Sequence, residues 1–206
     1  MIKVLGRADS LNVRKVLWAM DELGLKCERE DYGGPFGRVD TPEYLRVNPN
    51  GLVPTLIDDE TGIWESNTII RYLADRQGAA AFGGGTPMER AHIGQWMDWQ
   101  LSAVNSSIQS LFVQLVRLGE DKRDQRVVDA NLKTLHNLLG ILARALPDKG
   151  YLFGPTVTAA DVAIGVMLYR FFALVREPAV DPRIVQYHSE LAARPGFRAH
   201  VAIGKP

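Results

Sequence analysis

A serine and an asparagine two residues apart, Ser10 and Asn12, have the residue types and the position to bind an anion. They follow the short β-prone run 2–5 and open a segment whose apolar residues recur at the i, i+3, i+4, i+7 spacing of a helix. The first N–H groups of a helix lack partners and the helix dipole is positive there, so an anion is favoured at this end. Both side chains add hydrogen-bond donors. The same pair also fits an ordinary helix N-cap.

Two further groups of residues suit the ends of a short peptide. The Val53-Pro54 step opens a strand, where a cis bond would make a tight turn and leave the Val53 N–H and C=O free to pair with an extended ligand. Glu65 and Ser66 precede a helix, so this helix start can hold a carboxylate while Glu65 binds an ammonium. Each of these residues also has a purely structural interpretation. Val53-Pro54 fits a bend before an edge strand, Glu65 a solvated charge and Ser66 a plain helix cap.

The elements that must position these residues form an α/β domain. The hydrophobic pattern predicts the order β-α-β-α-β-β-α, with strands at 2–5, 26–30, 53–57 and 63–64 and helices at 12–23, 42–46 and 66–78. This order, with a proline opening the third strand, has the outline of a thioredoxin-like domain. The only cysteine, Cys27, cannot form a CxxC pair, which excludes dithiol exchange, and we interpret it as a buried packing residue.

The second half of the chain is predicted to be an all-α helical bundle. Helical patterns cover 88–118, 124–146, 159–175 and 182–194, and the Gly-rich stretch 79–87 suits a linker. We therefore divide the chain into a domain at 1–78, a linker at 79–87 and a helical domain at 88–206. Thr158 and Asp161 have the spacing of a capping box, which is a folding signal rather than a catalytic one.

Composition narrows the classes of function. The 206 residues carry 24 Lys plus Arg and 24 Asp plus Glu, so the positive field of a nucleic-acid-binding protein is missing. The longest apolar stretch, 162–169, falls short of the roughly 20 residues of a membrane span, and the first residues do not resemble a secretory signal. With a single cysteine, we expect a cytoplasmic protein without nucleic-acid or membrane partners. The four histidines form no HxxxH pair, and no metal site is expected.

Four motifs stand in register along the chain: SxNVxKV after the first strand, NPNGLVPTL, WESNTIIRYL and GPTVTAADVAIG. Together they resemble the cytosolic glutathione transferases, and the Ser-x-Asn form is similar to the phi-like bacterial members. The resemblance runs nearly end to end. It implies glutathione as the co-substrate, no metal, and a homodimer.

The resemblance also implies a role for each candidate residue. Ser10 meets the glutathione sulfur and Asn12 supports it, and either can be the main donor to the thiolate. Val53, before a cis Pro54, pairs with the cysteinyl backbone of glutathione. Glu65 and Ser66 hold its γ-glutamyl group. Phi-like members usually hold the glycyl carboxylate with a His-Lys pair, and here Arg38 is the available substitute.

The expected activity is transfer of glutathione to small electrophiles, as in detoxification. No histidine or carboxylate is placed in sequence to activate Ser10 as a nucleophile, so Ser10 is expected to donate to the thiolate. The helical domain should supply an apolar substrate pocket, for which the candidates on one long helix are Trp99, Leu111, Phe112 and Leu115. A non-catalytic glutathione or ligand-binding module and a glutathione-dependent peroxidase or dehalogenase remain the alternatives.

Overall fold

The computed structural model describes residues 2–26, 28–176 and 178–204. The described chain forms two compact units, one holding the residues up to Arg90 with the C-terminal segment from Arg194 to Gly204, the other holding Ala91–Ala193. Cys27 lies outside the described residues, so its interpretation as a packing residue stays a prediction.

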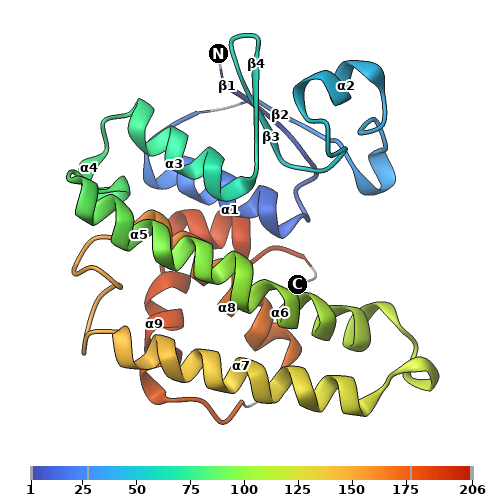
Figure 1. Ribbon diagram of the computed structural model, residues 1–206, viewed down its shortest axis with the longest axis vertical. Helices are drawn as coiled ribbons and strands as arrows, with labels where there is room; N and C mark the ends of the chain where they lie inside the picture. Colours follow the sequence, from blue (N-terminus) through green and yellow to red (C-terminus); the bar gives the residue numbers. More distant parts are fainter. Residues whose placement is uncertain (1, 27, 177, 205–206) are drawn as a thin grey trace. The chain divides into compact units, whose positions relative to one another are not determined.

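The first unit is built on a four-stranded sheet of order β2-β1-β3-β4 (Figure 1). Strands β1 and β2 are parallel, and the pairs β1/β3 and β3/β4 are antiparallel. The elements follow one another as β1 (Ile2–Leu5), α1 (Leu11–Glu22), β2 (Glu28–Glu30), η1 (Gly34–Phe36), α2 (Pro42–Val47), β3 (Thr55–Asp58), β4 (Thr61–Trp64) and α3 (Ser66–Arg76). The predicted thioredoxin-like order is confirmed, with the strand bounds shifted by one or two residues.

The core of this sheet unit lies between the strands and two helices. Helices α1 and α3 lie side by side against the sheet (Figure 1), and their apolar faces close over Val4 of β1 and Leu56 of β3, both fully buried. At strand β4 the backbone approaches α2 so closely that a Cβ on Gly62 would lie 2.6 Å from Cβ of Val47. Only glycine fits this approach. The sheet, together with its packing against α1 and α3, therefore sets where the first residues of these two helices lie.

After α3 the described chain is helical, and α4 with the first turn of α5 still belongs to the sheet unit. These helical elements are α4 (Ala80–Gly83), α5 (Pro87–Trp99), η2 (Gln100–Val104), α6 (Asn105–Phe112), η3 (Val113–Arg117), η4 (Glu120–Lys122), α7 (Gln125–Ala145), α8 (Ala159–Leu174) and α9 (Pro182–Ala192). The segments η2 and η3 are π-helical turns inside the predicted helix 88–118. Within the described residues, no helix has the length and apolar character needed to cross a membrane.

The predicted capping box at the start of α8 is confirmed. Thr158 is the N-cap, and its backbone N–H donates to Oδ2 of Asp161 at 2.8 Å. Asp161 is fully buried and also accepts from Thr158 Oγ1, from the N–H of Leu152 and from the hydroxyl of Tyr187. Burial raises the pKa of the Asp161 carboxyl, against the opposing effect of these hydrogen bonds.

The C-terminal segment belongs to the sheet unit, although the sequence division assigned it to the helical domain. It contains a further helical turn, η5 (Phe197–Val201), that the periodicity did not predict. Phe197 packs edge-on against Trp18 of α1, with ring centroids 5.1 Å apart, and both rings are buried. Burial of this aromatic pair holds the segment against α1.

Candidate functional site

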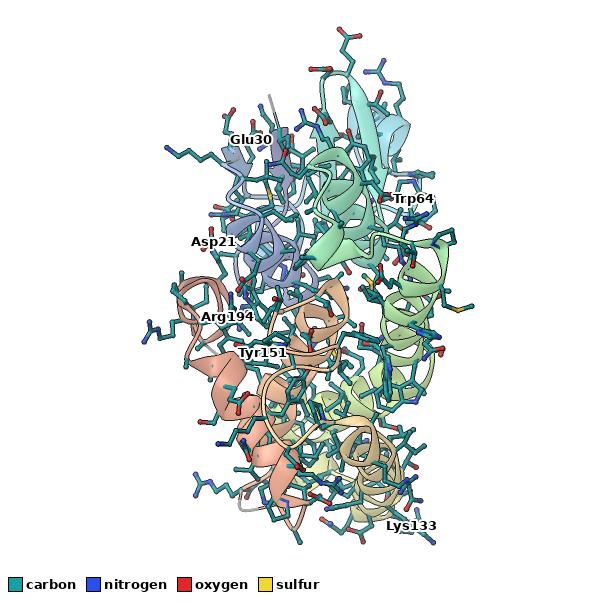
Figure 2. The ribbon with its side chains drawn as sticks, turned by 90° about the vertical axis from the view of Figure 1, so that its left-hand side faces the viewer. Asp21, Glu30, Trp64, Lys133, Tyr151 and Arg194 are labelled. Carbon is teal, nitrogen blue, oxygen red and sulfur yellow. The ribbon has the colours of Figure 1, made fainter. Side chains whose placement is uncertain are left out.

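A pocket in the sheet unit brings five of the seven predicted glutathione-binding residues together. The pocket has an empty volume of about 320 Å³, and it is lined by Asn12, Asn48, Asn50, Leu52, Val53, Pro54, Trp64, Glu65 and Ser66. Trp64, labelled in Figure 2, closes strand β4 at this pocket. Ser10 and Arg38 are not among the lining residues. The first turns of α1 and α3 and the turn before β3 therefore meet at one place.

Ser10 stands at the N-cap of α1, and within the described residues its hydroxyl makes no hydrogen bond. Its backbone is extended (φ −78°, ψ 123°), its N–H donates to the carbonyl of Arg7 at 3.2 Å, and its side chain makes no capping hydrogen bond. Asn12 is exposed, and its Oδ1 accepts from Oγ of Ser66 at 3.4 Å, a long contact that joins the starts of α1 and α3. The Ser10 hydroxyl is thus available to a ligand beside a positive helix end.

The Val53-Pro54 peptide bond is cis, as predicted. Within the described part of the chain, the backbone N–H and C=O of Val53 make no hydrogen bond. The loop before it is held from inside, because Nδ2 of the buried Asn48 donates to Leu52 O at 2.8 Å and to Thr55 Oγ1 at 2.9 Å. Tyr44 OH also donates to Leu52 O at 2.5 Å, and burial raises the pKa of the Tyr44 hydroxyl, which keeps it a neutral donor.

Glu65 has a left-handed backbone at the start of α3. Its φ is 67°, and it, rather than Ser66, is the N-cap residue, which corrects the sequence assignment of Ser66 as the cap. Ser66 is the first helical residue and is 5% exposed. A positive φ costs free energy in a residue other than glycine or asparagine and persists where the surrounding structure enforces it, often at a functional site. The Glu65 side chain is exposed and lines the pocket.

Arg38 is engaged elsewhere in the sheet unit. Its guanidinium lies 4.0 Å from the centroid of the Tyr32 ring, Nη2 donates to Tyr32 OH at 2.7 Å, and Nη2 lies 3.9 Å from Oε2 of Glu30. Glu30 closes β2 and is labelled in Figure 2. The role of Arg38 at the glycyl carboxylate therefore stays a prediction without a contact to the pocket.

Lys15 is a buried charged residue of α1 that does not line the pocket, and nothing in the sequence assigned it a separate role. It is fully buried on α1, and its Nζ donates at 2.8 Å to Oδ1 of Asn67 in the first turn of α3. Burial lowers the pKa of the Lys15 amine to about 7, although the negative charge of Glu65 opposes this shift. The signal in the sequence was a lysine between apolar residues of the predicted helix 12–23.

The buried Lys15 amine predicts a pH-dependent stability. Below pH 7 the amine is protonated in both folded and unfolded chains, and between pH 7 and 10.5 only the unfolded chain keeps the proton. Because the unfolded state then binds more protons, the free energy of unfolding rises with pH in this window, by at most about 1.4 kcal/mol per pH unit. Urea unfolding of wild type and Lys15→Met at several pH values measures the difference. Wild type should gain about 1 kcal/mol or more over the variant between pH 7.5 and 9.

The exposed Lys26 supplies a control, because Lys26→Met should follow the wild-type pH dependence. Parallel curves for wild type and Lys15→Met would contradict a lowered pKa at Lys15.

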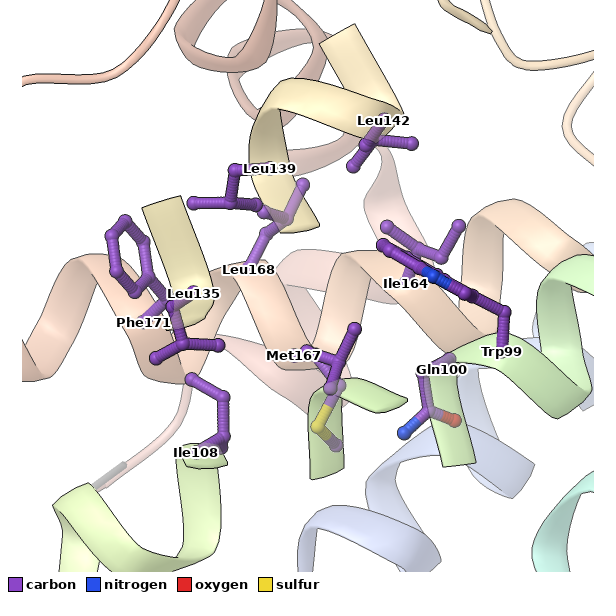
Figure 3. Close-up of a pocket in the computed structure, with 11 residues that line it drawn as sticks. Trp99, Gln100, Ile108, Leu135, Leu139, Leu142, Ile164, Met167, Leu168 and Phe171 are labelled. Atoms are coloured by element: carbon purple, nitrogen blue, oxygen red, sulfur yellow. The ribbon is translucent and has the colours of Figure 1, made fainter. Parts of the chain in front are cut away.

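The helical unit contains an apolar cavity that includes one of the four predicted substrate-pocket residues. Its empty volume is about 310 Å³, and Figure 3 shows lining side chains that converge from the end of α5 and from η2, α6, α7 and α8. The lining residues are Trp99, Gln100, Val104, Ile108, Leu135, Leu139, Leu142, Ile164, Met167, Leu168 and Phe171. Leu111, Phe112 and Leu115 do not line it. Leu111 is fully buried, and the Phe112 ring lies 4.3 Å from the guanidinium of Arg170.

No group of three or more His, Cys, Asp or Glu side chains could hold a metal ion among the residues that the structure describes. The site therefore consists of two helix starts, a free backbone edge and one carboxylate, on a thioredoxin-like domain followed by a helical domain. This combination has the chemistry to suit a short peptide carrying a charged amino-acid head group.

The chain belongs to the glutathione S-transferase family. Residues 5–81 match the family model of the glutathione S-transferase N-terminal domain, and residues 125–202 match that of the C-terminal domain. The chain is 35% identical to glutathione S-transferase GstB of Escherichia coli over 98% of this chain and 99% of the relative.

A solved structure and a second relative extend this comparison. A theta class glutathione S-transferase from Xanthomonas axonopodis pv. citri, with glutathione bound, superimposes with a TM-score of 0.91 at 36% identity, covering 100% of this chain and 99% of that one. Elongation factor 1-gamma 3 of Oryza sativa subsp. japonica is 30% identical over 91% of this chain, which spans only 45% of that relative.

Proposed function

We propose that this glutathione transferase binds glutathione in the pocket between the starts of α1 and α3 and presents the thiolate to small electrophiles. The observation that carries the proposal is the convergence of Asn12, Val53, Pro54, Glu65 and Ser66 on one pocket, with the free Ser10 hydroxyl at the adjoining helix start. Glutathione is a short peptide with a thiol at its centre and an amino-acid head group, and this set of partners matches both parts.

Ser10 would stabilise the thiolate by hydrogen bonding. A free thiol has a pKa of about 8.5, and lowering it to about 6.5 needs roughly 2.7 kcal/mol. A hydroxyl donor to a charged group supplies about 1.5 to 3 kcal/mol and a helix N-terminus about 0.3 to 1 kcal/mol, which together meet this need. In the described residues, no histidine or carboxylate is hydrogen-bonded to Ser10 Oγ. Ser10 is therefore a donor and not an activated nucleophile.

The peptide part of glutathione would be held by backbone and by α3. The unpaired N–H and C=O of Val53 suit the cysteinyl backbone, in the manner of a strand added to a sheet edge. The first N–H groups of α3, with Ser66 and Glu65, suit the carboxylate and the ammonium of the γ-glutamyl group. Arg38 is the proposed partner of the glycyl carboxylate, which requires it to leave Tyr32.

Glu65→Ala should weaken glutathione binding more than it slows turnover. The ammonium of the γ-glutamyl group loses its charged partner, so the Kd for glutathione should rise about 10-fold while kcat stays within about 2-fold of wild type. Calorimetric titration measures the affinity. Glu60→Ala, at an exposed glutamate of the β3–β4 turn, should leave it unchanged. An unaltered Kd in Glu65→Ala would show that the head group binds elsewhere.

The binding surface for the electrophile, the subclass, the cellular location and the oligomeric state are further proposals. The helical unit would supply the apolar surface for the electrophile, with Trp99, Leu111, Phe112 and Leu115 as candidates, of which Trp99 lines a cavity.

The Ser-x-Asn motif supports a phi-like placement, and a cytoplasmic homodimer acting in detoxification fits the family. Light scattering should then give twice the 22.9 kDa of one chain.

Turnover separates this function from the alternatives. The protein should conjugate glutathione with 1-chloro-2,4-dinitrobenzene, followed by the loss of free thiol, and a panel of peroxides and haloalkanes tests peroxidase and dehalogenase chemistry. A non-catalytic binding module is the second candidate, since the chain matches part of a longer protein named elongation factor 1-gamma 3. Glutathione binding without turnover of any electrophile or peroxide would favour that candidate.

A further inference from the structure

We propose that Arg14 is a positioning residue that ties the loop carrying Ser10 to the C-terminal segment, so that this segment helps to set the ionisation of bound glutathione. The inference rests on the proposed function. It concerns a residue behind the pocket, which does not touch the ligand itself.

Arg14 connects two stretches of backbone that are far apart in sequence. It is 1% exposed, it lies one turn after Ser10, and its backbone N–H donates to Ser10 O at 2.9 Å. Its Nε donates to Ala8 O at 3.2 Å, inside the loop between β1 and α1, and its Nη1 donates to Val201 O at 3.1 Å, in η5. One buried guanidinium thus holds the loop before Ser10 and the C-terminal segment together.

The C-terminal segment is anchored along the same face of α1. Four positions of α1 contact it, namely Arg14, Trp18, Asp21 and Glu22, which follow the i, i+4, i+7, i+8 spacing of one helical face. Arg194 forms a two-pronged ion pair with Glu22, its Nε donating to Oε1 at 2.6 Å and its Nη2 to Oε2 at 2.5 Å. Figure 2 labels Arg194 and Asp21 on these two elements.

The fit between the segment and α1 is close. The Cα of Gly196 approaches α1 so nearly that a Cβ there would lie 2.8 Å from Cδ1 of Trp18. His200 Nε2 lies 3.1 Å from Oδ2 of Asp21. A segment held at both of its ends keeps the Val201 carbonyl in place for Arg14.

The consequence concerns the geometry of the thiolate donor. A hydrogen bond from Ser10 to the sulfur stabilises charge only if the hydroxyl is held at the right distance and angle, and a shift of about 1 Å can forfeit much of this effect. The loop 6–10 precedes α1, and the contact to Ala8 O limits how far it can move. Loosening Arg14 should therefore raise the pKa of bound glutathione without removing any group that touches it.

Arg14→Met tests the proposal, since methionine keeps an unbranched apolar stem and removes the hydrogen-bond donors. The readout is the thiolate absorbance of the glutathione complex titrated against pH, with kcat and glutathione KM in parallel. We expect the thiol pKa to rise by about one unit and kcat at pH 6.5 to fall about 10-fold, with KM within about 3-fold of wild type. Arg198→Met, at an exposed arginine of η5, is the matched control and should behave as wild type.

A folded Arg14→Met protein with the wild-type thiol pKa would overturn the proposal, because a merely structural role lowers stability and leaves this pKa in place. Should Arg14→Met fail to fold, Phe197→Leu loosens the segment and leaves Arg14 intact. It should raise the thiol pKa by a smaller amount, and an unchanged pKa would again reject the inference. A wild-type complex without a lowered thiol pKa would instead count against the proposed function.

Discussion

Replacing Ser10 with alanine is expected to lower kcat about 10- to 1000-fold and to leave glutathione affinity within a few-fold of wild type. The Ser10 side chain makes no capping hydrogen bond, so its loss removes a donor to the ligand without breaking a hydrogen bond among the described residues. The thiolate then relies on the helix end and on Asn12. Steady-state kinetics with 1-chloro-2,4-dinitrobenzene and calorimetric titration with glutathione measure the two quantities.

Ser10→Thr keeps a hydroxyl at this position and should retain more activity than Ser10→Ala. If Ser10→Ala keeps the wild-type kcat, Ser10 is not the main donor. In that case Asn12→Ala, at a residue that lines the pocket, should produce the loss.

Replacing Asp161 with alanine is expected to lower the free energy of unfolding by about 3 to 5 kcal/mol. The carboxylate is buried and accepts four hydrogen bonds, from the backbone N–H groups of Leu152 and Thr158 and from the hydroxyls of Thr158 and Tyr187. Alanine leaves these donors buried without an acceptor, and each costs more than the lost bond itself. Urea unfolding followed by circular dichroism measures the change.

Asp161→Asn is the informative companion, because the amide can still accept from Leu152 and Tyr187 but cannot accept from Thr158 through its NH₂ group. It should lose less stability than the alanine variant. Asp148→Ala, at an exposed aspartate of the same unit, should change the free energy of unfolding by less than about 0.5 kcal/mol. Equal stability of Asp161→Ala and wild type would contradict the role of this network.

The sequence predicted the elements that have a strong hydrophobic period or that are bounded by Gly, Pro or capping residues. The sheet unit came from short apolar runs separated by Gly and Pro, and the start of α8 came from the spacing of Thr158 and Asp161. The C-terminal turn η5 was missed because its apolar residues, Phe197 and Val201, are too few to show a helical period. Their partner surface is the face of α1 with Arg14 and Trp18, which lies almost the whole chain away.

The candidate site could be predicted where a local rule ties residue type to position. A helix start, an X-Pro step and a hairpin end pointed to Asn12, Val53, Pro54, Glu65 and Ser66, which the structure brings together. Asn48, Asn50 and Trp64 line the pocket because of the tertiary fold, and no local sequence pattern indicates that they do.

Buried charged side chains could not be predicted from the sequence either. A lysine or an arginine on a helix is usually solvated, so Lys15 and Arg14 read as surface residues until their burial between packed elements is known. The left-handed backbone of Glu65 is likewise invisible in sequence, since glutamate rarely adopts it.

The thiol pKa of glutathione in the wild-type complex tests the central claim most directly. Ultraviolet difference absorbance of the thiolate, titrated from pH 5 to pH 9 with the protein in excess, gives this pKa without any electrophile. The site described here predicts a value near 6.5, about two units below that of a free thiol. A bound thiol that still titrates near 8.5 would contradict thiolate stabilisation at the start of α1.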